Sequence, residues 1–347
     1  MKIIGRLLGR GKYKIGIDIG SHSIKVAMVV GQKDGSFELK DSLSFPLLPG
    51  TIEEGRIKNE KILIDTLKSV KKTGLRGDTI AVLPSTASLV TTFELPEGVS
   101  KEQLDYFVIE EIAKKIPVSI DEVSFDYYPI EIEGKKYVTA VIGKKTIINY
   151  FLSLYEKAGI KLKSITSAYT ALSNAFFVNY PDNTERCIYL VNVGYSISTF
   201  CFLKEDLMIH GRSSNLGTNR IEEYVSTILN VEPERVRDLI EGGKIDRQVI
   251  DDALKNFAGL LAEELEACSI FCEKQHSLKE GDFINVYVCG GAAELPNFIY
   301  LLSSFLPDNF KAIQFDPFRK IKVPNDIATR VTNMKSVFTI AIGASVS

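Results

Sequence analysis

The feature that most constrains the fold is a segment that occurs twice. Residues 15–25 read "IGIDIGSHSIK" and residues 189–199 read "YLVNVGYSIST". Each has an apolar run, a polar residue, one apolar residue and a glycine, followed by a stretch with Ser or Thr. This pattern predicts a buried strand, a tight turn and a second strand. Gly20 and Gly194 are 174 residues apart, so we expect a chain with two similar halves.

A third glycine turn follows another apolar strand, in "NVYVCGGAAEL" at residues 285–295. Turns at strand ends can converge at one edge of an α/β sheet, where such folds bind ligands. Glycine lets backbone amides approach phosphate oxygens, and Ser or Thr hydroxyls add donors. Each turn alone is more simply interpreted as an ordinary turn in a sheet. The chain has no GxxxxGK and no GxGxxG segment, so the common nucleotide loops are absent.

Composition narrows the class of protein. Of the 347 residues, 45% are hydrophobic and 25% are charged, as in ordinary globular proteins. The formal net charge of −2 does not suggest a nucleic-acid partner. No apolar stretch is long enough for a membrane span, and none near the start is arranged like a signal peptide. The five cysteines form no CxxC pair, so we expect small buried hydrophobic residues in a reducing compartment.

The first twelve residues, "MKIIGRLLGRGK", are both basic and amphipathic. Apolar residues recur at helical spacing with Lys and Arg between them, and no acidic residue occurs before Asp18. Such a segment can lie on an anionic membrane surface. A frayed terminus, or a helix packed on its own domain, accounts for the pattern equally well.

Residues 89–160 form a block with a different pattern. A helix is expected after Ser100, which has a good N-cap side chain. A hairpin around Glu133–Gly134 and a helix closed by Gly159 are expected to follow. These elements predict an α+β insertion in the first half.

Together the motifs resemble those of the actin-like ATPase superfamily, whose duplicated domains close around a nucleotide. The resemblance implies an α/β, actin-like (ribonuclease H-like) fold with two duplicated domains around a nucleotide cleft. It further implies four subdomains: 1A (1–88, 161–185 and 333–347), 1C (89–160), 2A (186–216 and 281–332) and 2B (217–280).

The insertion narrows the resemblance to PilM proteins of the type IV pilus. "IEEIAKKIPVSIDEVSFDYYPI" is similar to the PilM segment in which an acidic helix leads to a proline, an acidic pair and an "(L/F)DY" strand. "GIDIGSHSIK" is close to the usual opening of the family, and the insertion corresponds to the 1C subdomain that PilM shares with FtsA. The resemblance covers nearly the whole chain.

The family's nucleotide residues can be carried over motif by motif. For the phosphates they are Asp18, Gly20, Ser21, Ser23, Lys25, Asn192, Gly194, Ser196 and Ser198. For the adenosine they are Gly217, Arg237, Gly290, Gly291, Ala292 and Leu295. The implied cofactor is ATP or ADP with Mg²⁺, held by Asp18 through water.

This chain departs from the family in the groups that carry charge. The second phosphate motif usually begins with Asp, but here it begins with Asn192, which cannot neutralise a metal or act as a base. Where the family often has Glu and Lys near the ribose, "VRDLIEGG" has Arg237 and Ile240. Phosphoryl transfer depends on positioning and charge neutralisation, so we expect weak or no hydrolysis. We also expect Asn192→Asp to raise magnesium-dependent binding or turnover.

The resemblance also implies partners and a location. It predicts a cytoplasmic scaffold, peripheral to the inner membrane, that docks the short cytoplasmic N-terminal tail of a PilN-like membrane protein and links the pilus platform to its motor ATPases. Membrane contact through residues 1–12 stays one of the alternatives for that segment. The predicted peptide groove contains Leu67, Val70, Phe107 and Phe125.

Two other functions remain open from the sequence. One is a catalytically active ATPase or sugar kinase of the same superfamily, although no aspartate base for a sugar substrate is evident. The other is a filament former like FtsA. FtsA carries its membrane anchor at the C-terminus, whereas "SVFTIAIGASVS" has no basic residue after Lys335, which disfavours this alternative.

Overall fold

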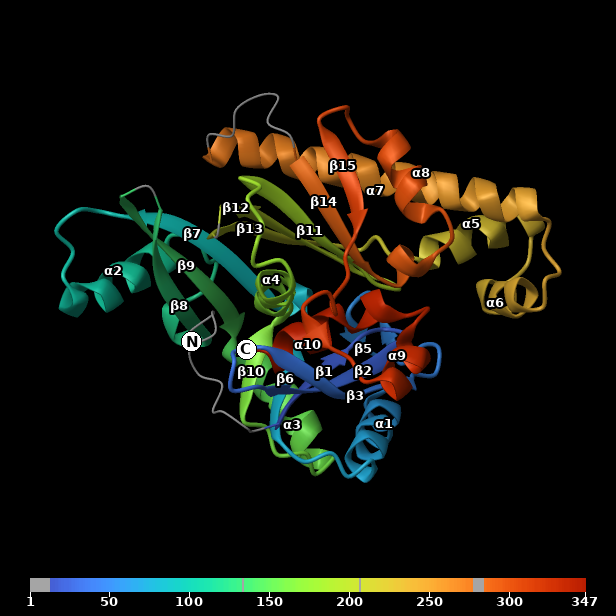
Figure 1. Cartoon of the computed structure of the whole chain (residues 1–347), viewed down its shortest axis with the longest axis horizontal. Coiled ribbons are helices and arrows are strands. Elements are labelled where there is room, and N and C mark those ends of the chain that lie inside the picture. Colours follow the sequence, from blue (N-terminus) through green and yellow to red (C-terminus); the bar gives the residue numbers. More distant parts are fainter. Residues whose placement is uncertain (1–12, 133, 206, 277–283) are drawn as a thin grey trace.

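The computed structural model describes residues 13–132, 134–205, 207–276 and 284–347. Two sheets form its centre (Figure 1). The first has the strand order β10-β6-β1-β2-β3-β16. Its strands are β1 (Tyr13–Ile19), β2 (Ser23–Gly31), β3 (Phe37–Pro46), β6 (Asp78–Leu83), β10 (Ser164–Ser167) and β16 (Ile321–Lys322).

The second sheet has the strand order β13-β12-β11-β14-β15. Its strands are β11 (Cys187–Val193), β12 (Ser198–Lys204), β13 (Leu207–Ser214), β14 (Ile284–Gly290) and β15 (Phe310–Gln314).

The two sheets share one topology. In each, three antiparallel strands are consecutive in sequence, and the first of them also pairs in parallel with a later strand. A further parallel strand extends each sheet beyond that one. Strands β1 and β11 therefore occupy equivalent places. The duplication predicted from the repeated segment is confirmed.

Two helices fill the space between the sheets, α4 (Ala168–Asn179) and α10 (Thr339–Ser345) (Figure 1). Almost all of α4 is buried, and one apolar cluster joins it to residues of both sheets. The helices approach so closely that a Cβ on Gly343 would lie 1.7 Å from the carbonyl oxygen of Ala171. Only glycine fits at that position.

The insertion forms a separate small sheet with the strand order β7-β9-β8. Its apolar cluster combines one face of this sheet with α2, where Val108 and Ile112 are fully buried. The hairpin and the N-cap at Ser100 are as predicted, and Gln103 completes a capping box with Ser100. The elements are β7 (Ser88–Leu95), α2 (Lys101–Ala113), β8 (Val123–Ile132) and β9 (Lys135–Lys144), with short 3₁₀ helices at Ser85–Ala87 and Ile120–Glu122.

The helix that follows the insertion packs elsewhere. α3 (Lys145–Lys157) lies beside α1 (Glu60–Lys72), and its Leu154 and Tyr155 are buried in the core of the first sheet. The predicted end of the insertion at residue 160 is therefore too late, because α3 buries its apolar face against the first sheet. A two-strand ladder, β4 (Ile52–Glu53) with β5 (Arg56–Ile57), precedes α1.

Helices cover the outer face of the second sheet. The long helix α7 runs along this face (Figure 1), and its buried residues include Phe257 and Leu265. All five cysteines are free and buried, as predicted. The helices are α5 (Asn219–Leu229), α6 (Pro233–Glu241), α7 (Arg247–His276) and α8 (Phe298–Phe305), with a 3₁₀ helix at Gly291–Glu294.

The chain crosses between the halves at two adjacent places. It leaves after α4 and returns after β15, and the rings of Tyr180 and Phe315 lie 5.3 Å apart at the crossing. The Asp316 amide donates to the Tyr180 hydroxyl at 3.0 Å, and the Lys320 amide donates to Asn179 Oδ1 at 3.1 Å.

The return occurs earlier than predicted. β16 pairs with β3 of the first sheet. α9 (Asn325–Val331) contributes Ile327 and Val331 to an apolar cluster that also contains residues of β2, β3 and β16. Residues from about 321 therefore belong to the first half, and the boundary at 332 is wrong. A 3₁₀ helix at Lys335–Phe338 leads into α10.

Candidate phosphate clamp and nucleoside pocket

Two equivalent turns face each other between the halves. The Gly20 amide donates to the Ser23 carbonyl at 3.1 Å, and the Gly194 amide donates to the Ile197 carbonyl at 3.0 Å. Each turn follows the carboxyl end of an equivalent strand, β1 or β11. The side chains of Ser21 and Ser196 hydrogen-bond to each other from opposite halves. The two predicted phosphate turns are therefore in direct contact.

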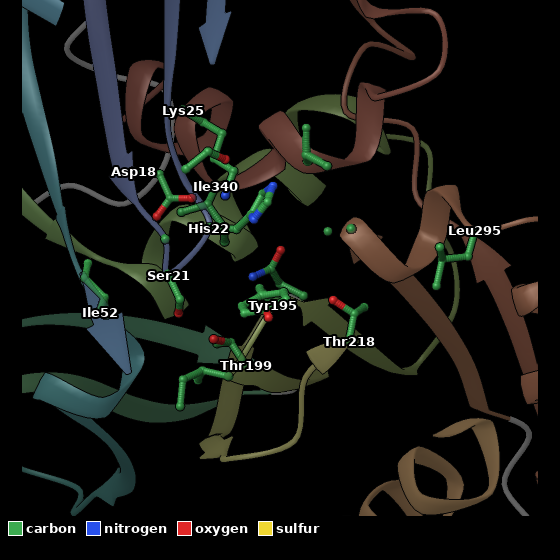
Figure 2. Close-up of a pocket in the computed structure, with 18 of the residues that line it drawn as sticks. Asp18, Ser21, His22, Lys25, Ile52, Tyr195, Thr199, Thr218, Leu295 and Ile340 are labelled. Carbon is green, nitrogen blue, oxygen red and sulfur yellow. The ribbon is translucent and has the colours of Figure 1, made fainter. Parts of the chain in front are cut away.

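The strand pairs beside the turns differ in charge. Asp18 on β1 lies opposite Lys25 on β2, and both side chains line the cavity between the halves (Figure 2). Burial raises the pKa of the Asp18 carboxyl and lowers that of the Lys25 ammonium, and the charge of each opposes the shift of the other. The first turn therefore carries two opposite charges that face each other across the strands and are largely removed from water.

The second turn carries neutral groups at the same positions. Asn192 on β11 lies opposite Thr199 on β12. Asn192 Oδ1 accepts a hydrogen bond from Cys289 Sγ at 3.6 Å, and Thr199 Oγ1 donates to Ser85 Oγ of the first half at 2.8 Å. Both members of the charged pair are thus replaced, not Asp alone.

The Gly-Gly turn closes one side of the site. Gly290 has a φ of +84°, and a Cβ there would lie 2.4 Å from the Val193 carbonyl oxygen and 2.9 Å from Asn192 Oδ1. Glycine is therefore required both by the backbone conformation and by the space. After the turn, Leu295 faces the cavity (Figure 2).

The cavity has a volume of about 870 Å³, within the usual size of small-molecule sites. Residues of both sheets and of α5, α6 and α7 line it. Of the predicted residues, the following line it: Asp18, Gly20, Ser21, Ser23, Lys25, Asn192, Gly194, Arg237, Gly290, Gly291 and Leu295.

Four predicted residues do not line the cavity and instead contact or pack behind the residues that do. Ser196 bonds Ser21, and Ser198 donates to the Leu216 carbonyl at 2.5 Å. Gly217 packs against the backbone of Tyr195. Ala292 is fully buried in the core of the second half. The prediction that Ser198, Gly217 and Ala292 contact the ligand directly does not fit these positions.

A polar network at the nucleoside end was missed in the sequence. Glu222 on α5 accepts from the Tyr195 hydroxyl at 2.6 Å and from Arg237 Nη2 at 3.0 Å. The Arg237 guanidinium carbon lies 5.1 Å from the centre of the Tyr195 ring. Burial and the Glu222 carboxylate both raise the pKa of Tyr195, so its hydroxyl stays a donor. One signal was available, since Glu222 lies three residues before buried Val225 and so shares its helix face.

The site contains few groups for a metal. Among the described residues, no group of three or more His, Cys, Asp or Glu side chains could hold a metal ion. Asp18 is the carboxylate beside the first phosphate turn, whereas Glu222 is engaged by Arg237 and Tyr195. These residues fit only an ion that takes most of its ligands from phosphate oxygens and water, as Mg²⁺ does.

The predicted peptide groove is partly wrong. Leu67 is 0% exposed and Val70 is 4% exposed, because both hold α1 on the first sheet. Neither offers the exposed apolar surface that a peptide groove requires. Phe125 packs against the core of the insertion and Phe107 against the ring of Phe93, and both are half-buried, so each keeps some accessible surface. The membrane contact predicted for residues 1–12 lies outside the described residues. In the part of the chain that the structure describes, no helix has the length and apolarity needed to cross a bilayer.

The duplicated sheets, with paired phosphate turns on either side of a central cavity, define a protein of the actin-like class. Residues 16–346 match the family of the type IV pilus assembly protein PilM. The chain therefore belongs to the PilM family.

Solved structures agree with this fold. The structure is similar to that of a PilM-PilN type IV pilus biogenesis complex, with a TM-score of 0.76 and 18% identity over 96% of this chain and 97% of that one. It is also similar to the ethanolamine utilization protein EutJ from Carboxydothermus hydrogenoformans, with a TM-score of 0.53 and 13% identity over 96% of this chain and 89% of that one.

Proposed function

We propose that this protein is a nucleotide-binding scaffold of the type IV pilus assembly platform with weak or no hydrolysis. The observation that carries the proposal is the cavity where two equivalent phosphate turns meet, only one of which keeps a charged pair. Family membership supplies the cellular process.

The turns are suited to the phosphates of ATP or ADP. The Lys25 ammonium lies over Gly20, where a Cβ would be 2.7 Å from Nζ, and Ser21 lines the cavity at the same turn. An ammonium and a hydroxyl are donors that suit phosphate oxygens. Asp18 would face a bound Mg²⁺ through water, and that ion would neutralise phosphate charge.

The other end of the cavity is suited to a nucleoside. Glu222 and Arg237 provide acceptors and donors for ribose hydroxyls, and the cavity there is lined by apolar side chains, including Ile240 and Leu295. A flat base needs apolar surface with few polar groups.

Hydrolysis is proposed to be weak because the second turn offers no base and no counter-charge. The positions that face phosphate from this turn are Asn192 and Thr199, both neutral. Loss of one positioned acid typically lowers such a reaction by orders of magnitude.

The proposed partner is the short cytoplasmic tail of a PilN-like inner-membrane protein. Support comes from the family and from the similarity to a PilM-PilN complex. The insertion is the proposed docking region. Among the strands that the structure describes, β8 pairs with β9 alone, and Phe107 and Phe125 retain accessible surface. An extended tail can add to such an edge. The protein would then lie on the cytoplasmic side of the inner membrane, in reach of the pilus motor ATPases.

The nucleotide part can be tested directly. The purified protein is denatured gently, and released nucleotide is identified by mass spectrometry. We expect about one ATP or ADP per chain, or saturable binding when ATP is added. A protein that neither retains nucleotide nor binds it at millimolar concentration contradicts the proposal. Phosphate release well above background that is lost in Asp18→Ala would favour an active ATPase instead.

The proposed docking of the PilN-like tail needs a separate measurement. A synthetic tail peptide is titrated by calorimetry into the protein and into Phe125→Ala, with Tyr300→Ala on the second half as the matched control. We expect micromolar binding that is at least about tenfold weaker in Phe125→Ala. No binding to the unaltered protein at high micromolar peptide would reject the docking role.

A further inference from the structure

A second cavity lies at the other end of the first sheet. The phosphate turn follows the carboxyl end of β1, whereas this cavity is lined from the amino-terminal part of β1 and the start of β6. Its volume is about 340 Å³, and the end of α1 and the loop after α3 complete it. In Figure 1, α1 and α3 lie at the side of the molecule away from α7.

The rim of this cavity is cationic and its floor is apolar. Lys71, Arg76 and Lys161 line the rim, and all are exposed. Within the described residues, none of the three forms an ion pair. The floor consists of aliphatic side chains that belong to the core of the first sheet or pack against it, namely Ile15, Ile17, Val70, Leu75 and Ile160.

The surroundings add to the positive charge. Lys72 and Lys163 are exposed neighbours in sequence of the rim residues, and the Lys163 amide is bonded to the Thr79 carbonyl beside the cavity. Acidic residues near this region include Asp78, which lies opposite Lys14 on the adjacent strand, Glu156 on α3, and Asp65 on α1, which is paired with Lys68 and also interacts with Lys72. We call Lys71, Lys72, Arg76, Lys161 and Lys163 the basic face.

The described chain begins at this face. Gly77, which lines the cavity, lies so close to Tyr13 that a Cβ would be 2.4 Å from its carbonyl oxygen. The sequence before Tyr13 contains Lys2, Arg6, Arg10 and Lys12 and no acidic residue. It has the same sign as the basic face and so cannot neutralise it. A complementary occupant must be anionic.

We propose that the basic face binds the surface of an anionic phospholipid bilayer, with a headgroup phosphate at the rim of the cavity. The apolar floor beneath a cationic rim matches the order of groups in a phospholipid, where a charged head covers an apolar stem. A bilayer also presents negative charge over a whole surface, which suits cations spread over one side of the molecule. This contact goes beyond the nucleotide and tail functions and places the nucleotide cleft on the side away from the membrane.

The test is co-flotation of the full chain with vesicles of phosphatidylcholine, with and without phosphatidylglycerol. The test variant is Lys71→Glu, Arg76→Glu, Lys161→Glu. Its matched control is Arg235→Glu, Lys244→Glu, Lys311→Glu, three exposed residues of the second half. A further variant changes Lys2, Arg6, Arg10 and Lys12 to Gln. If the melting temperature shows that this charge-reversal variant does not fold, the variant Lys71→Gln, Arg76→Gln, Lys161→Gln is used in its place.

Each basic residue near an anionic surface contributes about fivefold to binding. We therefore expect the partition into phosphatidylglycerol vesicles to fall by at least about tenfold in the test variant and by less than about twofold in the control. High salt should abolish the binding to phosphatidylglycerol vesicles. The variant altered at residues 2, 6, 10 and 12 (the N-terminal variant) should keep part of this binding.

Three results would overturn the proposal: unchanged vesicle binding by the test variant, complete loss in the N-terminal variant, or equal binding to neutral vesicles. Loss of tail-peptide binding with unchanged vesicle binding would overturn it in favour of an acidic peptide. The nucleotide content of the unaltered protein is measured in parallel. If that protein holds no nucleotide, the result counts against the nucleotide function only.

Discussion

The two phosphate turns have the same backbone but different chemistry. Each glycine amide is bonded to the carbonyl three residues later, and each turn joins the same two strands of its sheet. The first turn has Asp18 opposite Lys25, and the second has Asn192 opposite Thr199. Because both members of the pair differ, the net charge at the two positions is unchanged. The second turn therefore has the same shape as the first but carries neutral groups, and it bonds to the first through Ser196.

The largest expected effect comes from breaking the charged pair. Lys25→Met removes the phosphate-facing ammonium and leaves Asp18 uncompensated. We expect ATP affinity to fall by about a hundredfold and the free energy of unfolding to fall by about 3 kcal/mol near neutral pH. Calorimetry and urea denaturation measure these, with Lys33→Met at an exposed turn as the control.

The pH dependence of that variant has a defined sign. Without Lys25, burial raises the folded-state pKa of Asp18 further above its unfolded value of about 3.9. The loss of stability is then complete above the folded pKa and disappears as the pH falls below the unfolded one. Asp18→Asn with Lys25→Thr copies the second turn and should recover most of the stability but not the ATP affinity. Equal stability losses in the single and double variants would contradict the pairing.

The reverse change places a charge in the neutral turn. Asn192→Asp puts a carboxylate opposite Thr199, with no cation at the equivalent of Lys25. We expect the nucleotide-free protein to lose about 2 kcal/mol of stability near neutral pH and to regain it toward about pH 4. Thermal melts across pH measure this, with Asn192→Ser as the neutral control. The sequence alone led us to expect a gain in magnesium-dependent binding, which should now appear only with nucleotide present. An unchanged melting temperature without nucleotide would show that the second turn tolerates charge.

The nucleoside end gives a smaller effect. Glu222→Gln leaves Arg237 without its carboxylate and removes the acceptor of Tyr195. We expect ATP affinity to fall by about tenfold. Glu223→Gln, the neighbour paired with exposed Arg220, is the matched control and should change affinity by less than about twofold. Similar losses in both variants would indicate a general effect of α5 and not a contact with nucleoside.

The smallest effect concerns the bond between the turns. Ser21→Ala and Ser196→Ala each remove one hydroxyl of the hydrogen bond that joins the halves. A double-mutant cycle on the free energy of unfolding should give a coupling energy of about 0.5–1 kcal/mol. A coupling near zero would mean that the turns touch without stabilising the closed cleft.

Much of this fold could be predicted from local sequence. The duplication was visible because β1 and β11 are largely apolar runs, each with one polar residue two positions before the glycine of the same turn. The 1C-like insertion was visible because its helix and hairpin have clear caps and turn residues. The boundaries at 160 and 332 were missed because α3 and β16 are placed by tertiary packing, which periodicity within a segment does not reveal.

The candidate site was predictable to a similar degree. The glycine turns were predictable because a glycine that ends an apolar run favours a tight turn at the end of a buried strand. Glu222 was overlooked because its importance depends on its partners in space, Tyr195 and Arg237. Leu67 and Val70 were misassigned for the related reason that the apolar face of α1 fits a groove or a core equally well from sequence. Burial against the first sheet decides between the two.

The two connections between the halves, at Tyr180 and Phe315, lie side by side and form a candidate hinge. Both connections pass through one small region, where packed rings and the bonds from Asp316 and Lys320 hold them together. We therefore expect any rotation of one half relative to the other to have its axis near this region. Paired spin labels near this hinge should keep their separation when nucleotide binds or dissociates. Labels beside Ser21 and Ser196, on opposite sides of the cleft, should change their separation if the halves rotate.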